Sequence, residues 1–311
     1  MLDNYSLDQL RIFIAAADAG SFSAAGRRLN RAQSVVSQTV ANLEAQLGVQ
    51  LFDRTGRYPV PTDSGRALLT EARAVVGGMD LFKARAKSLA GGLEPELSVV
   101  VDVMFPAEAL TRAIVAFQTE FPATPLRMYV EVLGATLLPV LDGTCSFGVT
   151  SALALAPPRL TREGLRGVPM GMVASPRHEL ARFRGPIPTA SLVQYIQLVL
   201  TDRSDLSRGQ EFGVFSPRTW RLADLGAKHQ FLRAGLGWGA MPLGSVATDI
   251  ADGTLVLITL EDVPPESFVM PMSVVYRTES PPGPAGRWLI DKLKHNAELP
   301  APNEHTVSAP V

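Results

Sequence analysis

Apolar side chains recur with the spacing of an α-helix through the first 50 residues. The pattern predicts a helix that begins at a capping box of Ser6 and Gln9 and ends at Gly20. It predicts a second, short helix over residues 21–29 and a third over residues 32–47. The start of the chain is therefore expected to form a compact helical module.

The third predicted helix has two different faces. One is aliphatic and is expected to be buried: Val36, Val40, Leu43 and Leu47. The other carries small side chains, with hydrogen-bonding groups toward its N-terminal end: Ser34, Gln38, Ala41 and Ala45, with Ser37 at the border. A helix that enters the DNA major groove needs such a face, because bulky side chains would hold its backbone away from the base edges. The alternative is an ordinary solvent-exposed face.

Residues 49–61 predict a β-hairpin directly after this helix, which would form a wing beside a helix-turn-helix. Arg54 and Arg57 lie in its turn, where their side chains suit contact with phosphates or the minor groove. Arg54 could instead pair inside the protein with Asp53 or Asp63.

Residues 63–90 predict one long helix with an apolar seam. The gaps between successive seam residues alternate between four and three, which is the heptad spacing of helices that pair. The seam consists of Leu68, Ala72, Val75, Met79, Phe82, Ala86 and Leu89. It predicts a dimerisation helix, and the alternative is a helix packed on its own domain.

Beyond residue 93, short apolar strands alternate with helical segments. Strands are expected over residues 97–103, 126–132, 147–150, 170–174, 196–200, 220–222, 238–241 and 272–277, and helices over 107–121, 136–141 and 227–234. This alternation predicts parallel sheets with crossover helices. Ligands in such folds bind at the carboxyl ends of the strands.

Composition narrows the class of protein. The chain has 311 residues, 46% of them hydrophobic, and a net charge of −1. Residues 1–90 carry 11 basic and 8 acidic side chains, so this segment alone is positively charged. The asymmetry indicates either a local polyanion-binding surface or chance. The chain lacks an apolar run of transmembrane length and an N-terminal signal pattern, so we expect a cytoplasmic protein with no membrane contact.

Motifs for enzymatic chemistry are absent from the sequence. It contains no GxSxG elbow and no P-loop, and the glycines of residues 235–239 lack dinucleotide-binding spacing. Cys145 is the single cysteine, which favours plain packing over a thiol sensor, and the four histidines are scattered. We therefore expect no enzyme, no catalytic residue, no metal site and no cofactor.

Residues 21–65 resemble the winged helix-turn-helix of LysR-type transcriptional regulators. The matching positions, in order, are Phe22, Ala24, Ala25, Leu29, Gln33, Val36, Ser37, Leu43, Glu44, Gly48, Leu51, Phe52, Arg54, Thr62 and Gly65. The chain departs from the family pattern at Gln38, where Arg is frequent, at Ala32, where Thr usually caps the helix, and at Arg31, where an apolar residue is common. These departures affect which bases the helix would read more than whether it binds DNA.

The resemblance implies an α/β protein with a known domain order. A winged helix-turn-helix domain would cover residues 1–62, a linker helix 63–90 and an effector-binding domain 91–300. By analogy, the effector domain resembles a periplasmic binding protein with two α/β subdomains, residues 93–165 with 266–300 and residues 166–265. The polar, proline-rich tail 301–311 is expected to be disordered.

The resemblance also implies partners and DNA-contacting residues. It implies binding to an interrupted palindrome in double-stranded DNA, an antiparallel linker-helix dimer, pairing of dimers into a tetramer, and contact with RNA polymerase. The expected DNA-contacting residues are Arg31, Gln33, Ser34, Ser37, Gln38, Arg54, Arg57 and Thr62. A ligand-binding receptor that never touches DNA is the competing class, and the predicted wing argues against it.

The resemblance further implies a cleft for a small-molecule effector. The corresponding positions are Met104, Phe105, Leu133, Gly134, Thr150, Thr201, Arg203 and Asp224. An apolar wall of Met104, Phe105 and Leu133 predicts an apolar or aromatic effector, with any carboxylate facing Arg203. The alternative is that Arg203 is a solvated loop residue and the wall is ordinary packing.

Overall fold

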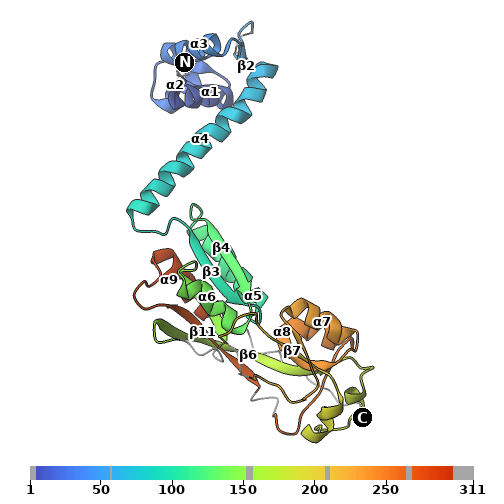
Figure 1. Cartoon of the computed structure of the whole chain (residues 1–311). Helices are drawn as coiled ribbons and strands as arrows, with labels where there is room; N and C mark the ends of the chain where they lie inside the picture. The colour runs from blue at the N-terminus through green and yellow to red at the C-terminus, as the bar shows by residue number, and fades with distance from the viewer. Residues whose placement is uncertain (1–4, 57, 152–156, 207–210, 264–267, 297–311) are drawn as a thin grey trace, which may run out of the picture. The chain divides into compact units, whose positions relative to one another are not determined.

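The structure is a computed structural model that describes residues 5–56, 58–151, 157–206, 211–263 and 268–296. The chain divides into two compact units at Gly91 and Gly92 (Figure 1). Arg57 and the tail 301–311 lie outside the described residues.

The first unit opens with three helices, α1 (Leu7–Ala19), α2 (Phe22–Leu29) and α3 (Gln33–Leu47). The capping box predicted for α1 is present, because the Ser6 hydroxyl accepts from the Gln9 N–H and the Gln9 side chain accepts from the Ser6 N–H. Gly20 and Gly48 follow α1 and α3 in the left-handed conformation, which lets the chain turn sharply.

The wing consists of β1 (Phe52–Asp53) and β2 (Val60–Pro61), paired antiparallel. It is followed by the long helix α4 (Asp63–Ala90). Phe52 of β1 is buried in the helical core, where its ring packs edge to face against the rings of Phe13 and Phe22. The core that fixes α3 is thus continuous with the wing.

A close approach of backbone explains the Thr-x-x-Gly sequence at the start of α4. The Thr62 hydroxyl donates to the Gln50 carbonyl and accepts from the Gly65 N–H. A Cβ at Gly65 would lie 2.1 Å from the Leu51 carbonyl oxygen, so any side chain there would push α4 away from the wing. The start of α4 is therefore held against Gln50 and Leu51, which lead into β1.

The second unit begins with β3 (Leu97–Asp102), α5 (Ala107–Glu120), β4 (Leu126–Glu131), the 3₁₀ helix η1 (Leu133–Leu137), α6 (Leu138–Leu141), β5 (Phe147–Ser151) and β6 (Leu160–Ala174). It continues with the 3₁₀ helices η2 (Glu179–Arg182) and η3 (Thr189–Gln194), then β7 (Gln197–Leu200), β8 (Thr219–Leu222), α7 (Leu225–Arg233), β9 (Trp238–Pro242), α8 (Leu243–Ala251), β10 (Val256–Leu257), β11 (Val269–Arg277) and α9 (Pro284–Asn296).

The described strands of this unit form one sheet in the order β4-β3-β5-β11-β6-β9-β7-β8, with β10 also paired to β6. At one end of the sheet, β3 pairs parallel with β4 and β5, and we call this the β3–β5 half. At the other end, β7 pairs parallel with β8 and β9, and we call this the β7–β9 half. The alternation of strands and helices predicts such parallel pairs. Figure 1 shows β6 and β11 running between the two halves. These two long strands connect the halves into one body.

The expectation of purely parallel sheets is wrong for β6 and β11. They pair antiparallel with each other, β11 also with β5, and β6 also with β9. The sequence predicted only the last five residues of β6, because residues 161–167 are partly or fully exposed and interrupted by charged and glycine residues. Such a strand is stabilised by its pairing with β11 over eight registered residue pairs rather than by an apolar sequence pattern.

The apolar cores of this unit lie on the faces of the sheet. In the β3–β5 half, Val99 and Val101 of β3 pack with α5 and α9, whereas Val100 points to the opposite face near α6. In the β7–β9 half, Leu232 of α7 and Val246 of α8 pack on Leu198 of β7. Helices thus cover the sheet in both halves.

Candidate functional site

Four of the eight side chains expected to contact DNA lie on α3. Gln33, Ser34 and Gln38 are exposed and Ser37 is half-buried, whereas Val36, Val40 and Leu43 are buried in the core. The Gln38 Nε2 donates to the Asn42 Oδ1 at 2.9 Å, which holds the Gln38 amide along the helix surface. A glutamine amide in this position can present a donor and an acceptor to a base edge.

Sequence reasoning missed two side chains on the exposed face of α3. Val35 is 45% exposed although it is aliphatic, and Asn42 is exposed beside Gln38. An exposed valine next to hydrogen-bonding groups suits contact with a thymine methyl group. The signal was present in the sequence, because positions 35, 38 and 42 lie on one side of a helix, but neither Val35 nor Asn42 was assigned to a face.

The first turn of α3 has no side-chain cap. Ala32 occupies the N-cap position, and no side chain accepts a hydrogen bond from the N–H groups that follow it. These N–H groups have no partner within the helix, so they can bind a phosphate oxygen. The replacement of the usual capping residue therefore leaves the first turn available to a ligand.

Three of the remaining candidates have partners within the protein. Arg31 forms a two-point ion pair with Asp8, and the Thr62 hydroxyl forms the hydrogen bonds that lock α4 to the wing. Arg54 pairs with Glu44 at 2.6 Å and lies over the Phe22 ring. Glu44 is the partner, not Asp53 or Asp63, and its other oxygen accepts from the N–H groups of Leu51 and Phe52. The structure therefore gives these three side chains a structural role. It does not describe Arg57.

The apolar seam of α4 falls into two parts. Leu68 and Ala72 pack against the core of the helical module, which matches the alternative that the seam packs on its own domain. The later seam residues face outward, with Val75 53%, Phe82 66% and Leu89 42% exposed, Ala86 exposed and Met79 half-buried. This outward part, Val75 to Leu89, is the part of the seam that can pair with another helix.

The second unit contains a cavity of about 370 Å³ between its two halves. Met104 and Leu133 come from the β3–β5 half, and Leu198, Val199 and Leu200 come from β7. The remaining described wall residues are Met170, Gln197, Glu211, Phe212, Gly213, Phe215, Lys228, Ala240, Val263, Phe268, Val269, Met270 and Pro271. This volume is within the usual range of small-molecule sites.

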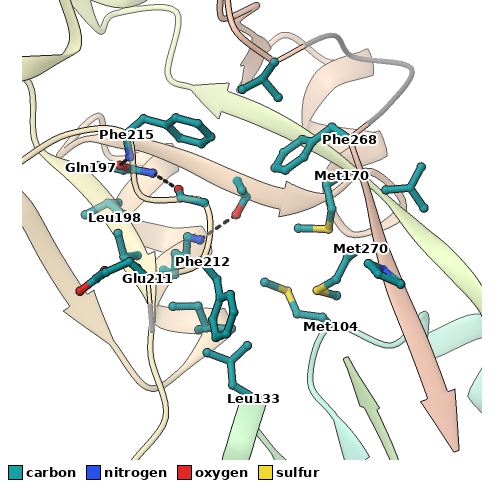
Figure 2. Close-up of a pocket in the computed structure, with 18 residues that line it drawn as sticks. Met104, Leu133, Met170, Gln197, Leu198, Glu211, Phe212, Phe215, Phe268 and Met270 are labelled. Atoms are coloured by element: carbon teal, nitrogen blue, oxygen red, sulfur yellow. Dashed lines mark hydrogen bonds between the residues drawn. The ribbon is translucent and has the colours of Figure 1, made fainter. Parts of the chain in front are cut away.

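The cavity wall is mainly apolar and includes three methionines and three phenylalanines. Figure 2 shows Met104, Met170 and Met270 with their sulfur atoms facing the same space, and Phe212, Phe215 and Phe268 around it. Methionine and phenylalanine side chains pack well against flat or irregular apolar ligands. The cavity is therefore suited to an apolar body with few polar groups.

Gln197 fixes the aromatic segment of the wall. Its side chain is buried, and its Oε1 accepts from the N–H groups of Phe215 and Ser216 at 2.7 and 3.1 Å. Its Nε2 donates to the Gly213 carbonyl at 2.6 Å (Figure 2). Because one buried amide satisfies three backbone groups, it positions Phe212 and Phe215 in the cavity wall.

Lys228 of α7 is a buried cation in the same wall. Its side chain is 2% exposed, and its ammonium donates to the Ala240 carbonyl at 2.7 Å. Burial lowers the pKa of Lys228 to about 8, because a charged ammonium is poorly stabilised away from water. Sequence reasoning missed this residue because a lysine in a helix is usually solvated.

Of the residues expected to form the cleft, Met104 and Leu133 line the cavity. Phe105 packs in the core of the β3–β5 half, Thr150 is buried against Thr136, and Asp224 caps α7. The Thr201 N–H donates to the Leu222 carbonyl, and Arg203 is exposed. These residues and Gly134 are not in the cavity wall, so the expected anchor Arg203 is replaced by Lys228 as the cation beside the apolar wall.

The segment around Gly134 connects the two halves next to the cavity. The Asp202 Oδ2 accepts from the Ala135 N–H at 3.0 Å, so the loop after β7 is tied to η1. A Cβ at Gly134 would lie 2.8 Å from this same Asp202 oxygen. Gly134 and the loop that holds Thr201 and Arg203 thus meet, as expected, but they do so outside the cavity wall.

Two further titratable groups are buried in the β3–β5 half. Asp102 ends β3, and burial raises its pKa to about 6 although its Oδ1 accepts from the Met104 N–H. Burial also raises the pKa of the Cys145 thiol, to about 11, and Cys145 packs in the apolar cluster near α6. A thiol of high pKa is unreactive, which agrees with a packing role.

The described residues offer neither a membrane span nor a metal-binding cluster. None of the described helices is long and apolar enough to cross a membrane. Within the same ranges, no group of three or more His, Cys, Asp or Glu side chains is placed to hold a metal ion.

Two family models match the chain, and together they cover both units. The model described as "Bacterial regulatory helix-turn-helix protein, lysR family" matches residues 7–66. The model described as "LysR substrate binding domain" matches residues 90–298. The first match contains α3 and the wing, and the second contains the whole cavity wall.

Characterised relatives match over nearly the full length. The chain is 28% identical over 300 residues to the HTH-type transcriptional regulator AceR of Acinetobacter baumannii, covering 96% of this chain and all of the relative. It is 28% identical over 303 residues to the HTH-type transcriptional regulator PunR of Escherichia coli, covering 96% and 95% of the two chains. Among solved structures, OxyR of Corynebacterium glutamicum aligns with a TM-score of 0.53 at 23% identity over 94% of each chain, which shows a shared fold.

Proposed function

The chain belongs to the LysR family of transcriptional regulators, and from this premise we propose that α3 reads DNA while the cavity of the second unit binds a small apolar effector. The family assignment establishes a regulator with a DNA-binding domain and an effector-binding domain. The proposal concerns which residues of this chain perform each task and what kind of molecule the cavity accepts.

The observation that carries the proposal is the cavity itself. It combines a volume of about 370 Å³ with three methionines and three phenylalanines, in the unit that matches the family's substrate-binding domain. A wall with so few polar groups cannot satisfy a sugar or a nucleotide, because each buried ligand hydroxyl or phosphate without a partner is costly. An apolar or aromatic compound fits this wall best.

On the DNA side, we assign base reading to Gln38 with Val35 beside it, and helix positioning to Gln33, Ser34 and the uncapped first turn of α3. The outward part of the α4 seam supports a dimer, since three large apolar side chains there have 42–66% of their surface exposed. A symmetric dimer implies two half-sites in an inverted repeat. A tetramer on an interrupted palindrome and contact with RNA polymerase are the finer parts of this proposal.

Effector control requires that the ligand favour one arrangement of the protein over another. The cavity supports such a role because its wall draws on both halves of the second unit, so a ligand that fills it contacts both. A ligand bound there can change the relative positions of the halves and hence the geometry of the dimer. Equal affinity for both arrangements would leave DNA binding unchanged.

The proposal is tested by a gel-shift titration of the full-length chain on the DNA upstream of its own gene, at fixed salt. We expect a discrete, saturable complex that an unrelated duplex of equal length competes for poorly. Competition of equal strength by the unrelated duplex would contradict sequence-specific binding. The effector part is tested separately, by calorimetry with apolar and aromatic compounds in the absence of DNA.

A further inference from the structure

The position of Lys228 in the cavity is set by backbone rather than by another charge. The residue lies on α7, whose N-cap is Asp224, and its ammonium donates to the Ala240 carbonyl of β9. A Cβ at Gly239 would lie 3.4 Å from the Lys228 Cε, which is an ordinary van der Waals distance, so the lysine stem packs against β9 at this residue. The stem therefore places the ammonium in the wall of a largely apolar cavity.

The hydrogen-bonding capacity of this ammonium exceeds what the protein supplies. An ammonium has three N–H donors, and the hydrogen bond found among the described residues is the one to Ala240. Glu211 also lines the cavity, but both its oxygens accept from the Arg221 guanidinium at 2.8 Å, and Figure 2 shows Glu211 turned away from the methionine sulfur atoms. Burial is the cause that lowers the pKa of Lys228, with no contribution from a described carboxylate.

A buried cation without a counter-charge is unfavourable unless something else provides one. We infer that Lys228 is the anchor for the carboxylate of an apolar organic acid that occupies the cavity. This inference rests on the proposed function, because it names the chemical class of the effector for the same cavity. The carboxylate would accept from the Lys228 ammonium, and the apolar body would lie among Met104, Met170, Met270 and the phenylalanines.

The observations favour a monocarboxylate over other anions. Among the described wall residues, Lys228 is the cationic side chain, and it offers at most two donors beyond its bond to Ala240. A phosphate ester would bring up to two negative charges and three acceptor oxygens into a largely apolar wall. A single carboxylate matches both the one positive charge and the available donors.

A purely structural role for Lys228 is the reading to be tested against this one. In that case the ammonium only ties α7 to β9 through Ala240. Its removal would lower the free energy of unfolding, and wild type itself would bind charged and neutral ligands equally well. The two roles separate when matched acid and amide ligands are compared, because the amide keeps the shape and loses the charge.

The test uses the full-length protein and isothermal calorimetry with three acid and amide pairs: 4-phenylbutanoate, 1-naphthoate and indole-3-acetate, each against its primary amide. Lys228→Met removes the charge and keeps an unbranched apolar stem. Lys228→Gln removes the charge but keeps a donor for the Ala240 carbonyl. It is used in place of Lys228→Met if that variant is unstable. Arg203→Ala is the matched control, since it removes an exposed cation outside the cavity wall.

We expect at least one acid to bind wild type about tenfold or more tightly than its amide, which is the range for a hydrogen-bonded charge. Lys228→Met or Lys228→Gln should bring acid and amide to equal affinity, and Arg203→Ala should keep the wild-type preference. Equal affinity in wild type, or a preference that survives loss of Lys228, overturns the anchor while leaving an apolar effector site in place. Binding by neither acids nor amides contradicts the proposed function, and the anchor with it.

The pH dependence provides a second readout. The acids are ionised throughout pH 7–9, so a loss of affinity in that range reports the protein. Because the protonated lysine binds the carboxylate and its free pKa is about 8, affinity should fall about tenfold from pH 7 to pH 9. The other charged groups on α7, α8, β8 and the wall have protein partners: Asp224, His229, Arg233, Asp249, Glu211 and Arg221. Lys228→Gln should abolish this fall, and a fall of equal size in that variant would assign it to another group.

Discussion

The two candidate sites of this protein are assembled in different ways. The side chains assigned to DNA reading lie on one helix, α3, within residues 33–42. The cavity wall draws on segments from Met104 to Pro271, including the loop after β3, strands β6, β7, β9 and β11, and helix α7. The first site is formed wherever the helix forms, whereas the second exists only when the whole second unit is folded.

This difference extends to how side chains are used. On α3, function requires exposed groups that protein partners leave available, and the first turn is uncapped. In the cavity wall, the buried Gln197 holds three backbone groups of the aromatic segment, and the buried Lys228 donates one hydrogen bond, to Ala240. Exposure marks the first site, and burial of polar side chains marks the second.

The largest effect on DNA binding is expected from the outward part of the α4 seam, which belongs to the first unit. Phe82→Lys replaces a side chain that is 66% exposed in one chain, so the fold of the chain should survive. In a dimer the same charge would be buried in an apolar seam without a partner. We expect light scattering to show loss of the dimer, and operator binding to weaken by about 100-fold or more, since a single half-site remains.

Lys83→Ala is the control for this substitution, because the side chain is exposed and adjacent in sequence. It should leave the mass and the operator affinity close to those of wild type. An unchanged mass for Phe82→Lys would show that the outward seam is not the dimer interface.

The two units should also respond differently to pH, because Asp102 lies in the second. Its folded pKa of about 6 is above its ordinary value of 3.8, so the folded state holds a proton that the unfolded state has released between these pH values. The free energy of unfolding of the second unit should therefore fall as pH rises from 4 to 6, by roughly 2–3 kcal/mol relative to Asp102→Asn. Denaturant titrations of both proteins at pH 4, 5, 6 and 7 measure this difference.

The unfolding of the first unit provides the internal control for Asp102, since its core does not include this residue. A difference between wild type and Asp102→Asn that stays constant across pH 4–7 would show that the carboxyl titrates normally in the folded protein.

On α3, Gln38→Ala should weaken operator binding by about 1–3 kcal/mol, the usual value of a two-point base contact. The loss should be confined to one base position in each half-site, since a phosphate contact would weaken all sequences alike. Binding measured on operators substituted at each position in turn distinguishes the two. Unchanged affinity and base preference would remove Gln38 from the reading face.

How much of each site the sequence reveals follows from this same contrast. The periodicity of Val36, Val40 and Leu43 located α3 and both its faces, because a helix side is a local property of the chain. The first residues of β6 and the cation Lys228 could not be found in this way. The first residues of β6 depend on pairing with β11, which is distant in sequence, and the burial of Lys228 depends on how α7 packs against β9. The resemblance to a family indicated Met104 and Leu133, which line the cavity, and it indicated Arg203, which does not.

A smaller effect is expected at Arg54, which tests whether the wing arginine belongs to the DNA site or to the core. Its pairing with Glu44 and its position over Phe22 predict that Arg54→Ala lowers the free energy of unfolding by about 1 kcal/mol. The slope of log K against log salt for operator binding should stay the same. A slope smaller by about 1 would instead show that Arg54 contacts a phosphate.

The central claim is that the cavity of the second unit controls the DNA-binding face of the first, and linkage tests it most directly. Operator affinity is measured by fluorescence anisotropy with full-length protein, with and without a saturating concentration of whichever acid of the calorimetry panel binds tightest. We predict a change of about 5-fold or more, matched by an equal change in ligand affinity when operator is present, because coupling is reciprocal. Identical operator affinity in the two conditions, with the ligand shown to be bound, would contradict the claim.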